Sequence, residues 1–285
     1  MKVIFVIKSV ITAAGKGTRL LPITKELPKE MLSPAEVGPI IRGVCKIERG
    51  DKTRQKPFVL DFRTSDAILE YVNGQEVERF SQSGVATPDH TIRTKNWPML
   101  VSTPDASRIA SFRDDVESSF VDFVKRYKSY FKQNNARNDD SLVELDPVPR
   151  VVLVPGLGLY GLGRSAKAAR VAADIAESTV KTVTYAESIG VFESISEADM
   201  FDVEYWSLEQ AKLGKATEKP LAGHVVVVTG GGGAIGMAIA AAFSKQGAEV
   251  ALLDIDPDAL DRATSFCLLY TSPSPRDATL SRMPS

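Results

Sequence analysis

The sequence predicts an α/β protein, and three kinds of segment carry that prediction. Residues 151–154 and 225–229 are short, continuous apolar runs, as buried strands are. Residues 166–179 are rich in alanine and predict a helix. Residues 107–131 predict a longer helix, because apolar side chains recur there at steps of three and four: Phe112, Val116, Phe120, Phe123, Tyr127 and Tyr130. We interpret this stripe as core packing.

Length and composition limit the possible classes of function. The 285 residues are enough for one or two domains, and a net charge of −1 gives no electrostatic signature of nucleic-acid or anionic-membrane binding. No apolar run approaches the ~20 residues of a membrane-spanning helix. Two cysteines, Cys45 and Cys267, do not form a disulfide framework, so we expect a reducing, cytoplasmic location. Two histidines exclude a metal site built from three histidines of this chain.

The chain changes character along its length, which predicts several parts. A helix is expected from Ser196, whose spacing to Asp199 is that of a capping box, to about Lys212, and Gly214 should end it. The segments we expect are an N-terminal segment at 1–33, a domain at 34–213, a linker at 214–223, a second domain beginning at 224–267 and a disordered tail at 268–285.

A glycine-rich turn in the second domain carries the clearest chemical signal. The apolar run 225–229 enters the turn, a helix is expected at 237–246, and the strand expected at 250–253 ends in Asp254. Such glycines let backbone N–H groups approach a pyrophosphate, and the acid binds ribose hydroxyls of NAD while repelling the 2′-phosphate of NADP. The alternative is a tight turn that binds nothing. The predicted NAD-binding residues are Thr229, Gly230, Gly232, Gly233, Ile235, Gly236 and Asp254.

These residues resemble the opening motif T-G-x-x-x-G-x-G of the short-chain dehydrogenases. Thr229, Gly230 and Gly236 match it, and Ala234 replaces the middle glycine, a change we expect the turn to tolerate. The resemblance ends at about Cys267. That family also implies a catalytic tyrosine with a lysine four residues later, and none of the seven tyrosines here has one. We therefore expect the hydride-transfer machinery to be absent from this chain.

Four blocks upstream resemble a second family. They are FVLDFRTSDAILEYVNG (58–74), ATPDHTIRTKNWP (86–98), RVVLVPGLGLYGLGRSAKAA (150–169) and SEADMFDVEYWSLEQAKLGKATEKPLAG (196–223). With the dehydrogenase start, they resemble the bifunctional rhamnulose-1-phosphate aldolase/short-chain dehydrogenases over residues 34–267. This resemblance implies a class II aldolase-type fragment followed by the first β-α-β unit of a Rossmann fold. It also implies zinc-dependent cleavage of a ketose 1-phosphate to dihydroxyacetone phosphate and lactaldehyde, and oxidation of the aldehyde with NAD.

The resemblance gives roles to the segment around His90. It implies that His90 is one zinc ligand, and Arg93 and Lys95 are candidates to bind a substrate phosphate. The family's paired His-x-His ligands are expected upstream, where this chain has no histidine. A hydrogen-bonded loop histidine is the alternative for His90, and a complete zinc site is not expected from this chain alone.

A second glycine pattern lies at 155–164. Gly156, Gly158 and Gly161 match G-x-G-x-x-G, and the loop is expected to join a strand to a helix. No second strand ending in an acid follows at the required distance. We favour a structural turn, with phosphate binding assisted by Arg164 as the alternative.

The two ends of the chain resemble other sequences. Residues 11–32 resemble the start of sugar-1-phosphate nucleotidyltransferases, which implies that a nucleoside triphosphate is bound through Gly15, Gly17, Thr18, Arg19 and Lys29. The remainder of that family's pattern does not follow. The tail, CLLYTSPSPRDATLSRMPS, resembles translated sequencing-adapter read-through, which suggests a chimera, although a natural tail is the alternative.

Together these observations predict a fragment of a bifunctional sugar-catabolic enzyme that is inactive by itself. Its ligands would be a sugar phosphate or an aldehyde, NAD, and zinc at an incomplete site, and an oligomer is allowed. A sugar-1-phosphate nucleotidyltransferase and a bare NAD-binding module are the alternatives.

Overall fold

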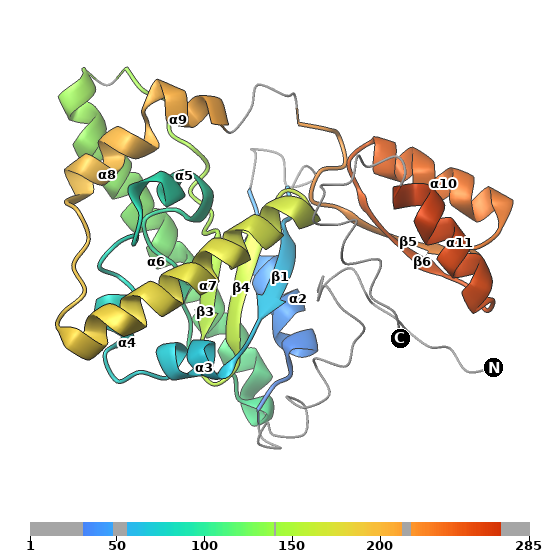
Figure 1. Cartoon of the computed structure of the whole chain (residues 1–285), viewed down its shortest axis with the longest axis horizontal. Coiled ribbons are helices and arrows are strands. Elements are labelled where there is room, and N and C mark those ends of the chain that lie inside the picture. Colours follow the sequence, from blue (N-terminus) through green and yellow to red (C-terminus); the bar gives the residue numbers. More distant parts are fainter. Residues whose placement is uncertain (1–30, 48–55, 140, 213–217, 269–285) are drawn as a thin grey trace. The chain divides into compact units, whose positions relative to one another are not determined.

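The computed structural model describes residues 31–47, 56–139, 141–212 and 218–268 (Figure 1). The chain divides into two compact units, the larger ending at Glu218 and the smaller beginning at Lys219 along the described chain. No helix in these ranges is long and apolar enough to cross a lipid bilayer. The predicted nucleotide-binding residues Gly15, Gly17, Thr18, Arg19 and Lys29, and the tail from 269 onward, lie outside the described residues.

The larger unit is built on a four-stranded mixed sheet. Its strands are β1 (Val59–Arg63), β2 (Met99–Leu100), β3 (Val151–Val154) and β4 (Gly158–Gly163), in the order β1-β4-β3-β2. The pairs β1–β4 and β4–β3 are antiparallel, and β2–β3 is parallel.

Helices surround this sheet. They are α2 (Pro34–Val44), α3 (Asp66–Val72), α4 (Val77–Phe80), α5 (Thr91–Thr94), α6 (Ile109–Asn135), α7 (Ala166–Ile189), α8 (Glu197–Glu204) and α9 (Ser207–Lys212). Short 3₁₀ turns, Pro88–His90, Ala106–Arg108 and Ala136–Asn138, connect some of them. The apolar residues of α2 and α6 pack on one face of the sheet, and those of α3 and α7 on the other.

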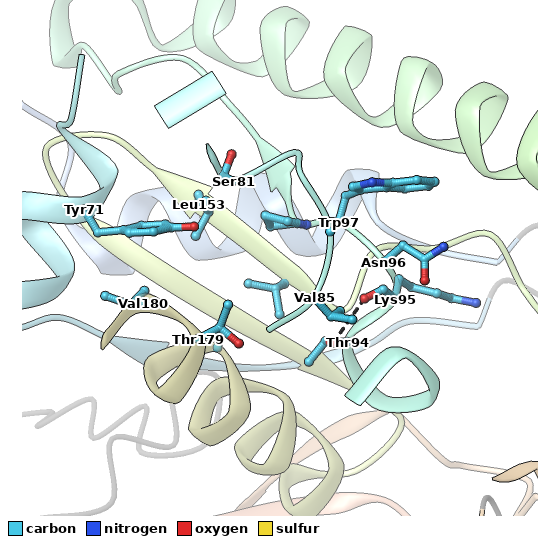
Figure 2. A pocket seen from close by; sticks show the side chains of 14 residues that line it. Tyr71, Ser81, Val85, Thr94, Lys95, Asn96, Trp97, Leu153, Thr179 and Val180 are labelled. Carbon is cyan, nitrogen blue, oxygen red and sulfur yellow. Dashed lines mark hydrogen bonds between the residues drawn. The ribbon is translucent and has the colours of Figure 1, made fainter. Parts of the chain in front are cut away.

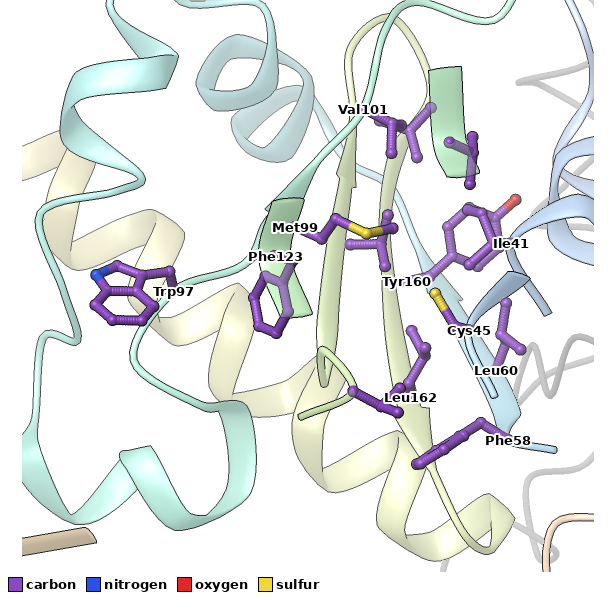
Figure 3. Packing of buried hydrophobic residues seen from close by; sticks show 14 of the residues in the cluster. Ile41, Cys45, Phe58, Leu60, Trp97, Met99, Val101, Phe123, Tyr160 and Leu162 are labelled. Carbon is purple, nitrogen blue, oxygen red and sulfur yellow. The ribbon is translucent and has the colours of Figure 1, made fainter. Parts of the chain in front are cut away.

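The alternation of side chains along β3 divides the core in two. Val152 and Val154 belong to the cluster with α2 and α6, whereas Val151 and Leu153 pack against α7. Figure 3 shows the first cluster, which contains Ile41 of α2, Phe123 of α6, the strand residues Leu60, Met99, Tyr160 and Leu162, and Phe58 just before β1. Because both faces of β3 are buried, its sequence is continuously apolar, as predicted.

Two glycines of β4 let α7 lie close to the sheet. A methyl group at Gly161 or Gly163 would overlap the backbone of Ala169 in the first turns of α7. The alanines of α7 complete this contact, since Ala169, Ala172 and Ala173 are buried. The Ala-rich helix is therefore confirmed, and it is ten residues longer than expected because no helix breaker precedes Gly190.

The loop with the G-x-G-x-x-G pattern is a β-hairpin. Val154 pairs with Gly158 across it, and Gly156 (φ +79°) and Gly158 (φ +141°) adopt backbone conformations that favour glycine. The structural turn is thus confirmed. The expectation that the loop leads directly into a helix is wrong, because strand β4 intervenes and its glycines pack under α7.

The other predicted helices also form, with changes at their ends. The stripe helix extends over Ile109–Asn135 and buries most of its predicted apolar residues. Ser196 caps α8 by accepting the N–H of Asp199, as predicted. The expected single helix to Lys212 is instead two helices, α8 and α9. The break lies at Tyr205, where α8 ends. The Tyr205 ring stacks on Phe201 and its hydroxyl lies within hydrogen-bond distance of the Tyr127 hydroxyl.

The smaller unit is a strand-helix-strand arrangement followed by a helix. Strands β5 (Val225–Thr229) and β6 (Glu249–Leu253) are parallel neighbours, connected by α10 (Ala234–Lys245), and α11 (Pro257–Leu268) follows. Helix α10 begins three residues earlier than expected, directly after the glycine turn. That this unit opens a Rossmann fold stays a prediction.

Candidate functional site

The glycine turn between β5 and α10 is the first part of the predicted dinucleotide site. Gly230 has a φ of +67°, and nothing lies within 4 Å of the place where its side chain would project. A methyl group at Gly236 would overlap the carbonyl of Gly230, so the first turn of α10 touches the loop that precedes it. The turn is therefore open where a side chain of Gly230 would project and closely packed where Gly236 meets the Gly230 carbonyl. The N-terminus of α10 follows at once and favours a negative charge.

Asp254 faces this turn from the end of β6. Its carboxylate accepts the N–H of Gly232 at 2.8 Å and that of Asp256 at 3.2 Å. These backbone donors at Asp256 and Gly232 lower the pKa of Asp254, so the group is a carboxylate at neutral pH. An acid and a glycine turn thus meet at the carboxyl ends of two parallel strands, where open α/β sheets bind ligands.

The other predicted NAD-binding residues lie around the same turn. Thr229 ends β5, Gly233 caps α10 and Ile235 projects into solvent with an exposed fraction of 79%. Ala234, in place of the motif's middle glycine, is exposed at the start of α10, so its methyl group has room. The structure thus brings the predicted NAD-binding residues together around one turn, and their role stays a prediction.

A second candidate site is a pocket in the larger unit, here termed the basic pocket. Five basic side chains line it: Arg93, Lys95, Arg150, Arg164 and Lys167. Its volume is about 410 Å³, within the ~300–1,000 Å³ of small-molecule pockets. The structure brings together the predicted phosphate ligands Arg93 and Lys95 and the predicted alternative Arg164.

The sequence did not reveal Arg150 and Lys167 as members of this pocket. Arg150 lies beside the end of β4, since its carbonyl accepts the N–H of Leu162 at 2.8 Å. The hairpin therefore places Arg150 near Arg164, fourteen positions along the chain, and Lys167 follows in the first turn of α7. The place of Arg150 and Lys167 in the pocket follows from the antiparallel pairing of β3 and β4, which the sequence did not predict.

Acidic partners hold the two arginines in place. Arg150 donates to Asp146 at 2.6 Å and to the carbonyl of Val148 at 2.7 Å, and Arg164 donates to Glu218 at 2.6 Å. Both guanidinium groups lie over the ring of Phe58, at 4.9 Å and 5.4 Å from its centroid. Burial alone would raise the pKa of Asp146, but Arg150 and Lys95 lower it, so this carboxyl stays charged.

Lys95 is part of a buried polar cluster. Its Nζ lies 3.6 Å from Glu204 Oε1 and 3.9 Å from the centre of the Tyr127 ring. Tyr127 and Tyr130 donate to Glu204 at 2.9 and 3.1 Å. Burial lowers the pKa of Lys95 to about 8, against the opposing effect of Glu204. That Lys95 binds a phosphate stays a prediction, because the carboxylate of Glu204 already compensates its positive charge.

The backbone at Lys95 adopts an unusual conformation. Its φ of 63° with ψ of 177° lies in a region that is nearly specific to glycine and costs roughly 1–3 kcal/mol. The next residue, Asn96, is buried, and neither polar atom of its amide has a hydrogen-bond partner in the described residues. The loop at Lys95 and Asn96 thus contains both a strained backbone and a buried amide without a hydrogen-bond partner among the described residues.

A smaller pocket lies on the other side of this loop (Figure 2). Tyr71, Leu153, Thr179 and Val180 line it from α3, β3 and α7, while the Lys95 side chain extends away from its Tyr71 end. Its volume is about 40 Å³, room for a few water molecules at ~10–15 Å³ each. The pocket is too small for a sugar phosphate.

His90 does not lie in a metal site within the residues that the structure describes. It ends the 3₁₀ turn before α5, and its buried Nδ1 has no hydrogen-bond partner there. No three histidine, cysteine, aspartate or glutamate side chains of the described ranges gather around a common point. His90 remains a candidate single ligand, and the residues on view do not complete a zinc site.

The comparisons with known proteins match the larger unit to a family. The model of the family described as "Aldolase class II, second domain" matches residues 33–213. A protein of Bacillus subtilis (strain 168), described as "Uncharacterized oxidoreductase YuxG", is 30% identical over 242 residues, which are 84% of this chain and 33% of that protein. The chain thus spans about a third of the length of this relative. No solved structure matches the chain significantly.

Proposed function

Because this chain belongs to the class II aldolase second-domain family, we propose that it is part of a two-activity enzyme of sugar-phosphate breakdown. Residues 33–213 would contribute to an aldolase that cleaves a ketose 1-phosphate of the rhamnulose-1-phosphate type. The smaller unit would bind NAD for the oxidation of the aldehyde product. The family match supports an aldolase-type larger unit, and the description of the relative as an oxidoreductase supports a dehydrogenase part.

One observation carries the proposal furthest: Asp254 faces the glycine turn. The carboxylate accepts the Gly232 N–H at 2.8 Å, which fixes it against the turn. In that position it can accept hydrogen bonds from the two ribose hydroxyls of NAD. The 2′-phosphate of NADP would bring a second negative charge against it, so NAD is favoured.

The aldolase activity rests on the family. A bound zinc ion would act as a Lewis acid on the substrate carbonyl. Among the residues that the structure describes, His90 is the ligand that the resemblance assigns.

The dehydrogenase activity is expected to be absent from the isolated chain. None of its tyrosines has a lysine four residues later, so the expected proton-transfer pair is missing. NADH formation from lactaldehyde that is lost on Gly230→Val would contradict this expectation. The proposal for the smaller unit is therefore one of binding.

The experiment is a calorimetric titration of the full chain with NAD, NADP and ADP-ribose. We expect weak binding of NAD and ADP-ribose and weaker binding of NADP. Asp254→Ala should reduce the affinity for NAD, and it should reduce the ratio of the affinities for NAD and NADP. The matched control is Asp258→Ala, an exposed acid in the first turn of α11.

Two results would count against the proposal. Equal affinities for NAD and NADP in the wild type would remove the role of Asp254. An absence of NAD and ADP-ribose binding in a folded chain would remove the binding site itself.

A further inference from the structure

We propose that Lys95 is a nucleophilic lysine that captures a small 2-oxo acid, such as glyoxylate, as an imine in the basic pocket. This gives the side chain a covalent role, which the sequence did not suggest. The proposal depends neither on a zinc ion nor on the dinucleotide site of the smaller unit.

The surroundings of Lys95 favour an amine that gives up its proton. The side chain has an exposed fraction of 4%, and its Nζ lies 3.9 Å from the centre of the Tyr127 ring. Burial lowers the pKa of Lys95 to about 8, opposed by the charge of Glu204 and assisted by that of Arg150. Roughly a tenth of such a lysine is the free amine at pH 7, whereas an exposed lysine has less than ~0.1%. A lysine removed from water beside a second cation is an activated nucleophile.

The basic pocket gives small molecules access to this amine. Lys95 lines the pocket together with Asp146 and Arg150, and both of these charges act on the Lys95 pKa, so they lie near its ammonium group. The pocket volume of about 410 Å³ leaves ample room for a molecule of two or three carbon atoms. A small carbonyl compound in the pocket can therefore meet the Lys95 amine.

The backbone at Lys95 supports a chemical role. Its φ of 63° with ψ of 177° is strained for a residue with a side chain, and strain of this kind clusters at functional sites. The fold thus keeps a residue that is at once strained, buried and charged. A reactive amine at the pocket wall accounts for all three features.

The carboxylate of Glu204 supplies the proton transfers of imine formation. The Lys95 ammonium passes a proton to Glu204, whose Oε1 lies 3.6 Å from Nζ, and the free amine attacks the carbonyl carbon. The C–N bond forms, and a proton of the nitrogen moves to the carbonyl oxygen. Glu204 returns its proton to that hydroxyl, which leaves as water. The product is a protonated imine, so the charge beside Glu204 is the same before and after the reaction.

Arg150 favours a carbonyl compound that carries a carboxylate. Its guanidinium donates to Asp146 and to the carbonyl of Val148, and it has further N–H groups with which arginine binds carboxylates. Because Arg150 also lies near the Lys95 amine, a carboxylate one bond away from the reacting carbonyl would be close to it. A 2-oxo acid has this arrangement, and it separates the two like charges of Lys95 and Arg150.

The test traps the imine in the full chain with sodium cyanoborohydride at pH 7. The probe is glyoxylate, and glycolaldehyde, which has the same number of carbon atoms but no charge, is the control. Reduction of the glyoxylate imine leaves a carboxymethyl group on the lysine, which mass spectrometry of peptides locates. Lys181, an exposed lysine on α7, is the reference site. The variants are Lys95→Met and, as the matched control, Lys181→Met.

We expect glyoxylate to modify Lys95 of the wild type at least about tenfold faster than Lys181 at pH 7. The rate at Lys95 should level off above about pH 8, where its amine is already deprotonated, while the rate at Lys181 rises toward pH 10. Glycolaldehyde should modify Lys95 roughly fivefold more slowly than glyoxylate. The fast modification should be lost in Lys95→Met and kept in Lys181→Met.

Two results in the wild type would overturn the proposal. Modification of Lys95 that is no faster than that of Lys181 would remove the covalent role. Equal rates with glyoxylate and glycolaldehyde would remove the preference for a 2-oxo acid. Both results are independent of the folding of Lys95→Met and of NAD binding, so they are distinguishable from a failure of the proposed function.

Discussion

The two units differ in how their strands are covered. In the larger unit every residue of β3 is buried, because α7 packs on one face and α2 and α6 on the other. In β5 only Val228 is buried, and Val227 has an exposed fraction of 56%. The β-branched run of β5 predicted a buried strand, and the structure corrects this within its described residues.

This difference separates two kinds of site. The glycine turn is shaped by the close approach of Gly236 to Gly230 and by contacts of its glycines with β6 and α11, so it depends on the smaller unit alone. The basic pocket is assembled from residues 92 to 171, so it requires the complete sheet and α7. Damage to the packing of the larger unit should therefore abolish its pocket and leave the turn intact.

The largest effect is expected at Glu204. Glu204→Ala leaves Lys95 buried without its carboxylate partner, which should lower the free energy of unfolding by about 3–5 kcal/mol. Chemical denaturation monitored by circular dichroism measures this change. Glu197→Ala, on the exposed side of the same helix, should cost less than about 1 kcal/mol. Similar losses in the two variants would contradict a buried role for Glu204.

A smaller effect is expected where β4 meets α7. Gly163→Ala places a methyl group against the backbone of Ala169, and overpacking of this kind costs typically ~1–3 kcal/mol. Gly43→Ala in α2 has open space and should be neutral or stabilising by up to about 1 kcal/mol. Thermal melting compares the two, and a harmless Gly163→Ala would show that α7 lies less closely on the sheet.

Local patterns predicted the helices α6, α7, α8 and α10 and the glycine turn, whereas α2, α3 and α11 were not predicted. The stripe in α6, the cap at Ser196 and the order of β5, α10 and β6 follow from spacing and turn chemistry within a few residues. Strand β4 was missed, because Gly158–Gly163 contains three glycines and reads as a turn. Its glycines are explained only by the approach of α7, a contact between separate elements.

The candidate sites divide in the same way. The residues of the glycine turn and Asp254 are recognisable from their spacing alone. In the basic pocket, Arg93 and Lys95 were predicted, whereas Arg150 and Lys167 depend on the pairing of β3 with β4. The buried cluster of Lys95 and Glu204 joins residues 109 positions apart, a distance that helical or strand periodicity does not span.

The pH dependence of the free energy of unfolding should distinguish Lys95, in its buried cluster, from the other lysines. The pKa of Lys95 is about 8 in the folded chain, below the usual value of 10.5, so the unfolded chain binds more protons between these pH values. The contribution of Lys95 to stability should therefore rise between pH 8 and pH 10, by on the order of 1–2 kcal/mol. Burial raises the pKa of the Cys45 thiol, which has the opposite effect over the same range, and the buried tyrosines, whose pKa values are also raised, have it above pH 10.

Denaturation curves at pH 7.5 to 10 measure this effect. The stability of the wild type should rise over this range relative to that of Lys95→Met, whose side chain carries no proton, because Cys45 acts equally on both. A difference between the two proteins that stays constant over this range would contradict the lowered pKa of Lys95.

The central claim is that the smaller unit binds a dinucleotide through its glycine turn, and one matched pair tests it most directly. ADP-ribose is titrated into Gly236→Ala and Gly233→Ala, with circular dichroism to establish that both fold. The added methyl at Gly236 overlaps the Gly230 carbonyl, whereas at Gly233 the nearest atom is 3.5 Å away. We predict that Gly236→Ala loses binding while Gly233→Ala keeps most of it. Equal affinities in the two folded variants would contradict the claim.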